Sequence, residues 1–147
     1  MDAKEFKSTF GKVAKNYLFE KAFTGWFKES HECIAVLDLQ KSNYGNYFEL
    51  NIKIFVQGLF GNNYSKNKDL VKKETGNIFL RQPNKFRNIF DLDTSMEIDQ
   101  LIEKLSELFN EFIMPFTEKA LTIKGIKELY KNGELFLLPA VKQQLEI

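Results

Sequence analysis

The stretch that decides the fold is Cys33–Gln57, CIAVLDLQKSNYGNYFELNIKIFVQ. It contains two runs rich in β-branched and aromatic residues, and the polar segment Asn43–Asn46 separates them. Turn residues between two alternating runs of this kind are typical of a β-hairpin. The sequence therefore predicts two antiparallel strands joined by a short turn.

The alternation of side chains also predicts how these two strands pair. An apolar face results from three cross-strand pairs: Leu39 with Leu50, Leu37 with Ile52, and Ala35 with Ile54. A slip of one residue would mix polar and apolar side chains on both faces, which a half-buried sheet does not tolerate. We therefore expect one face of the hairpin to form the core. The opposite face would carry Val36, Asp38, Gln40, Glu49, Asn51 and Lys53.

Three further segments are predicted to extend the sheet or to remain irregular. Residues 21–29 alternate as a strand, with Phe23 and Phe27 directed to the core and Trp26 and Lys28 to the polar face. Another strand is expected at 77–82, where Arg81 would join the polar face. Residues 57–76 form either a mobile loop or a loop with a short helix near 66–74, and residues 84–92 form an edge strand or a turn.

Helices are predicted at both ends of the chain. Apolar residues recur at helical spacing over 3–17 and again over 95–113, where Thr94 would cap the helix. Pro115 would kink this helix or begin another one. Thr122 is expected to cap a further helix that ends at Asn132-Gly133. The order indicates one α+β domain over 1–147, in which two or three C-terminal helices and an N-terminal helix cover one face of a meander of about four strands.

Composition limits the classes of partner and the compartment. The 147 residues include 44% hydrophobic and 28% charged residues, as in a globular domain. The net charge is only +1, so no overall field favours nucleic acid or an acidic membrane. The N-terminus lacks the apolar run of a signal peptide, and no window approaches the ~20 apolar residues of a membrane span. We expect a cytoplasmic protein that binds neither nucleic acid nor membranes; the oligomeric state stays open.

The sequence contains no recognisable catalytic, cofactor or metal motif. His31 is the only histidine and Cys33 the only cysteine, so neither has the partners that a metal site or a catalytic triad requires. Phosphate-binding and dinucleotide-binding glycine motifs are missing as well. We therefore predict no catalytic residue, no cofactor and no metal, with Cys33 as a buried apolar residue.

The polar face of the sheet is the remaining candidate site. A solvated face with cross-strand ion pairs is the ordinary interpretation of such a pattern. The only tryptophan of the chain is predicted to join this face, and Trp and Arg dominate binding energy at protein interfaces. We therefore predict a partner-binding site made of Trp26, Asp38, Gln40, Glu49, Asn51 and Arg81.

The hairpin also resembles a known family. The run Leu39–Gly45, LQKSNYG, followed by Tyr47-Phe48 and Leu50–Ile52, is similar to the bacterial domain-of-unknown-function family 4304, as are the opening Lys4–Phe6 and the strand end at Arg81. The resemblance covers residues 3–113 and departs from the family in the insertion at 57–76. Because this family has no established activity, the resemblance implies a bacterial, cytoplasmic, single-domain protein and no catalytic residue.

Two functions remain open from the sequence. The first is a non-enzymatic protein-interaction module, in its sharpest form an immunity-type protein that neutralises a toxin, by analogy with small bacterial α+β proteins. The second is a small-molecule binder or hydrolase that uses the polar face as a pocket, with Asp38 or Glu49 as acid or base and Arg81 holding an anion. The sequence leaves undecided whether this face is open or covered.

Overall fold

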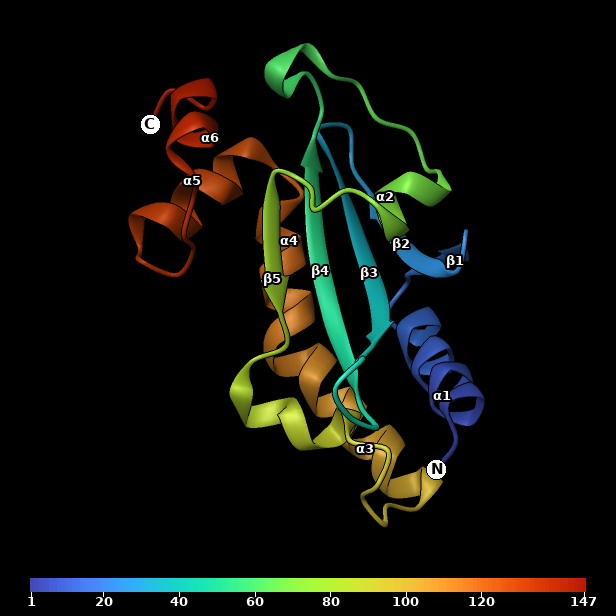
Figure 1. Cartoon of the computed structure of the whole chain (residues 1–147). Coiled ribbons are helices and arrows are strands. Elements are labelled where there is room, and N and C mark those ends of the chain that lie inside the picture. The colour runs from blue at the N-terminus through green and yellow to red at the C-terminus, as the bar shows by residue number, and fades with distance from the viewer.

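A computed structural model describes all 147 residues, Met1–Ile147, and its centre is a five-stranded antiparallel sheet (Figure 1). The strands follow the chain in the order β1-β2-β3-β4-β5. They are β1 (Glu20–Ala22), β2 (Gly25–Glu29), β3 (Cys33–Lys41), β4 (Phe48–Val56) and β5 (Ile78–Arg81). The predicted α+β class is confirmed, with one strand more than the four expected.

The predicted hairpin register is confirmed residue by residue. Leu39 lies opposite Leu50, and the pairs Leu37–Ile52 and Ala35–Ile54 follow. All these side chains are buried in one large hydrophobic core. On the far side of β4, β5 continues the pattern, because Ile78 and Leu80 lie beside Ile54 and Ile52.

Helices from both ends of the chain contribute buried residues to the core on this apolar face. They are α1 (Ala3–Asn16), α3 (Ile98–Leu108), α4 (Met114–Ala120), α5 (Ile123–Lys131) and α6 (Pro139–Gln144). In Figure 1, α4 lies behind the sheet, and α1 lies below β1 and β2. A π-helical turn, Phe109–Ile113, joins α3 to α4 just before Pro115. The stacked and tilted rings of Phe10, Tyr17 and Phe109 connect α1 to this turn.

Short elements fill the connections. Two 3₁₀ helices, Leu59–Gly61 and Asn84–Phe90, lie in the segments 57–76 and 84–92. Residues 84–92 therefore contain no edge strand. The predicted helix near 66–74 is confirmed as α2 (Lys68–Lys72), capped by Asn67. Thr122 caps α5 as predicted. Thr94 does not cap α3, because its hydroxyl donates to the Asp91 carbonyl at 2.7 Å; the N-cap is Glu97.

The predicted strand over residues 21–29 is two strands, and its orientation was wrong. Phe23 and Thr24 both adopt positive φ and form the turn between β1 and β2. Trp26 pairs with Leu37 and is buried in the main core, whereas Phe27 pairs with Val36 and faces the other side of the sheet. Trp26 therefore lies on the face opposite to the predicted binding site.

None of the helices has the length and apolarity needed to cross a membrane.

Candidate functional site

The second face of the sheet has an apolar half and a polar half. Segment 57–76 returns across this face, and α2 packs its Leu70 and Val71 against the apolar half. This small second core comprises Phe27, Ile34, Val36, Phe55, Leu70 and Val71. The polar half lies beside α2, toward the end of β3 and β5. The second face is thus partly covered, and only its polar half remains available.

Asn51 is the centre of the polar half. The register places Asp38 and Arg81 on either side of it, on β3 and β5. The Asn51 amide donates to Asp38 Oδ2 at 3.3 Å and to Gln40 Oε1 at 2.9 Å. Its carbonyl oxygen accepts from Arg81 Nε at 3.2 Å. Since Asn51 and Asp38 are both buried, this row of hydrogen bonds fixes the floor of the polar half.

Two lysines connect α2 to this floor. Lys72 Nζ lies 3.0 Å from Asp38 Oδ1 in an ion pair whose carboxylate is almost fully buried. The buried Lys53 amine donates to the carbonyls of Val71 at 2.6 Å and Leu70 at 3.3 Å. Burial lowers the pKa of Lys53, while the nearby Asp38 carboxylate acts in the opposite direction. These contacts hold α2 against the sheet beside the polar half.

Glu49 belongs to a separate group of side chains. Its carboxylate accepts a hydrogen bond from Gln82 Nε2 at 2.8 Å and lies 3.9 Å from Arg87. Gln82 in turn accepts from the backbone N–H of Leu50 at 2.7 Å. Glu49 therefore turns toward the end of β5 and away from the Asn51 row.

The polar half forms the floor of a recess of about 520 Å³, which we call the sheet cleft. Six cations and two carboxylates are among its lining residues. The lining comprises Lys7, Asp38, Leu39, Gln40, Lys41, Asn51, Lys53, Lys72, Lys73, Glu74, Thr75, Phe79 and Arg81. The chain as a whole carries a net charge of only +1, so positive charge is concentrated here.

A family model agrees with the resemblance seen in the hairpin. The model of a domain of unknown function, DUF4304, matches residues 10–119 of this chain. The chain belongs to the DUF4304 family. The match includes the whole sheet and every residue of the sheet cleft except Lys7. A search of curated proteins and a search of solved structures each gave no match.

The structure of this DUF4304 member brings together four of the six predicted site residues. Asp38, Gln40, Asn51 and Arg81 all line the cleft. Glu49 lies on the same face outside the cleft, and Trp26 is in the core on the other side of the sheet. The sequence prediction missed Lys72 and Lys73, because nothing in the pattern indicated that α2 would fold back over the sheet.

The structure also shows the surroundings of the side chains that could bind a metal and of Cys33. No three histidine, cysteine, aspartate or glutamate side chains are grouped as metal ligands. Burial in the core raises the pKa of Cys33 to about 12, so its thiol stays protonated at neutral pH. Cys33 is therefore a small apolar residue of β3, consistent with its burial against the helices.

Proposed function

We propose that this DUF4304 member is a non-enzymatic interaction module that binds an acidic surface of another protein in the sheet cleft. The observation that carries this proposal is the excess of cations in the cleft, six against two carboxylates, in a nearly neutral chain. Complementary charge steers partners together and selects among them. An acidic surface would pair with the cations of this cleft, whereas a basic surface would be repelled by them.

Arg81 and Phe79 favour a protein as the partner. Arg81 uses only its Nε atom in the Asn51 row and forms no ion pair. Its guanidinium carbon lies 5.9 Å from the ring centre of Phe79, which is 39% exposed. An exposed aromatic ring beside an available guanidinium is the combination in which interface energy concentrates.

The hydrolase alternative is less well supported by the same contacts. It would use Asp38 or Glu49 as a general acid or base. Lys72 and Asn51 hold the Asp38 carboxylate, and Gln82 holds that of Glu49. Both carboxylates are thus already engaged by partners within the protein. We therefore favour binding over proton transfer.

An immunity-type protein that neutralises a toxin is one form of this proposal. Such a protein acts by covering a surface of its target, so it needs a complementary face and no catalytic group. The cleft, with its cations and exposed Phe79, supplies a face of that kind.

The proposal predicts that the partner contacts Phe79. A photo-crosslinking amino acid at position 79, introduced into the protein in its own cells, should capture a protein with an acidic surface. The control carries the same group at Phe136, which is 78% exposed and does not line the cleft. The proposal is wrong if position 79 captures nothing, or if both positions capture the same proteins with equal yield.

A further inference from the structure

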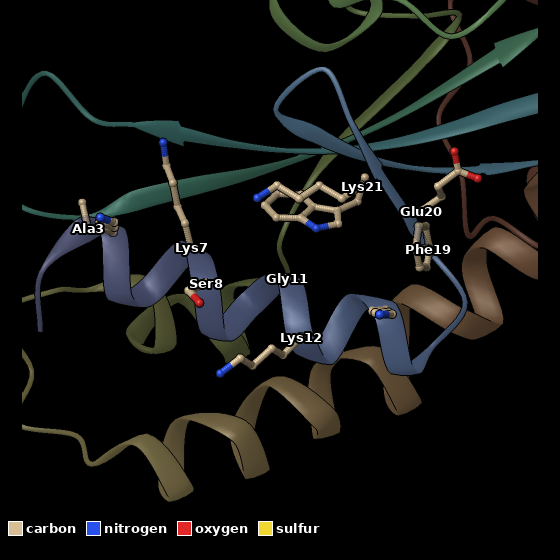
Figure 2. A pocket seen from close by; sticks show the side chains of 11 residues that line it. Ala3, Lys7, Ser8, Gly11, Lys12, Phe19, Glu20 and Lys21 are labelled. Atoms are coloured by element: carbon tan, nitrogen blue, oxygen red, sulfur yellow. The ribbon is translucent and has the colours of Figure 1, made fainter.

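A second and larger recess, of about 970 Å³, lies between α1 and the β1–β2 hairpin (Figure 2). We call it the lysine groove. Its lining comprises Ala3, Lys4, Lys7, Ser8, Gly11, Lys12, Lys15, Phe19, Glu20, Lys21 and Trp26. Figure 2 shows Lys7 extending from α1 toward the strands, with Phe19, Glu20 and Lys21 on the opposite wall. The groove is separate from the sheet cleft, although Lys7 lines both.

The lysines of the lysine groove have no carboxylate partners within the protein. Five of its lining residues are lysines, and none of them forms an ion pair. The single carboxylate of the lining, Glu20, is already paired with Lys66 at 2.9 Å. Like charges around one recess repel each other, and a ligand of opposite charge would relieve that repulsion.

The floor of the groove contains an unsatisfied hydrogen-bond donor. Trp26 lines the groove, is only 3% exposed, and its Nε1 is the only buried side-chain nitrogen or oxygen without a hydrogen-bond partner. Gly11 of α1 faces this atom, since a Cβ at Gly11 would lie 3.3 Å from Trp26 Nε1. Buried donors are normally paired, and an unpaired one is costly. This donor is closed to solvent by α1 at Gly11, so an acceptor atom of a ligand in the groove would reach it only if α1 moved away from the strand.

We propose that the lysine groove binds a small ligand that carries a diphosphate or triphosphate group. Figure 2 shows Lys12 turned away from the strands, but a single carboxylate would still leave most of the other ammonium groups unpaired. An oligophosphate offers several charged oxygens. Lysine is a common phosphate ligand that acts as a point charge. The volume lies at the upper end of the ~300–1,000 Å³ range of small-molecule sites, so it also accommodates an organic group bound to the phosphates.

The only tryptophan of the chain reports on this site directly. The purified protein is titrated with inorganic tripolyphosphate and with adenosine diphosphate, and binding is followed by calorimetry and by Trp26 fluorescence. Adenosine without phosphate serves as the uncharged control. We expect both phosphate probes to bind and adenosine not to bind. If adenosine diphosphate binds more tightly than tripolyphosphate, the apolar floor of the groove contacts the base. If the two bind equally, the protein recognises the phosphates alone.

Matched variants separate a site from general attraction of anions. Lys15→Gln with Lys21→Gln removes two groove lysines, and Lys104→Gln with Lys119→Gln removes two exposed lysines that lie outside it. Since hydrogen bonds to charged groups contribute strongly, the groove pair should weaken binding by about tenfold or more, and the control pair by less than about twofold. The proposal is overturned if neither phosphate probe binds, or if both pairs weaken binding equally.

Discussion

Replacing Ile52 by alanine should lower the free energy of unfolding by about 2–5 kcal/mol, since truncating a buried aliphatic side chain loses burial and leaves a cavity. Ile52 lies in the interior strand β4, between Leu37 on β3 and Leu80 on β5, and is fully buried. The measurement is urea unfolding at equilibrium, followed by circular dichroism.

The matched control for this change is Ile98→Ala. Ile98 begins α3 and is 43% exposed, so the same truncation there should change stability by less than about 1 kcal/mol. If Ile52→Ala and Ile98→Ala were equally mild, the placement of the main core against β4 would be wrong.

Replacing Gly125 by alanine should destabilise the protein by about 1–3 kcal/mol or more, as overpacking does. Gly125 lies in the first turn of α5, where alanine is otherwise the better helix former by about 1 kcal/mol. A Cβ at this position would lie 2.6 Å from the carbonyl carbon of Lys119 and would collide with its oxygen. The obstacle is backbone at the end of α4, so α4 and α5 would have to separate.

Gly133→Ala distinguishes this collision from ordinary glycine effects. Gly133 has φ of 74° and no atom near its added Cβ, so alanine there meets only the backbone cost of about 1–2 kcal/mol. Thermal and urea unfolding should rank Gly125→Ala as the more damaging change. A neutral or stabilising Gly125→Ala would contradict the close contact between α4 and α5.

The hairpin could be predicted because its alternation leaves one choice of register. Apolar residues occupy every second position of β3 and β4 on the core side, and any slip would expose them. The α1 and α5 helices were predictable for a similar reason, since apolar spacing and, for α5, the Thr122 cap mark them. Local patterns were therefore sufficient where polar and apolar residues contrast.

The orientation of β2 could not be predicted because that contrast is missing. Trp26 and Phe27 are adjacent aromatic residues, and both are buried, one in each core. The turn before them uses Phe23 and Thr24 at positive φ, where glycine or asparagine is usual. Only the position of α2, which brings Val71 close to Gly25, shows why both faces of β2 are buried.

The sequence was sufficient to predict the strand residues of the candidate site, but not the residues that α2 contributes to it. Strand register places Asp38, Asn51 and Arg81 in one row. The lysines of α2 join them through tertiary contacts between Lys72 and Asp38 and between Lys53 and the end of α2. Such contacts depend on the path of segment 57–76, which has no periodic pattern to reveal it.

Partner binding by an Arg81→Ala variant tests the central proposal most directly. The partner captured at position 79 is purified, and its affinity is measured by calorimetry for the wild type, Arg81→Ala and Arg87→Ala. Arg87 is the only other arginine, is 58% exposed and does not line the sheet cleft. We predict about 30-fold weaker binding for Arg81→Ala, equivalent to ~2 kcal/mol, and a change of less than about twofold for Arg87→Ala. Wild-type affinity in a folded Arg81→Ala variant would contradict the assignment of the sheet cleft as the binding site.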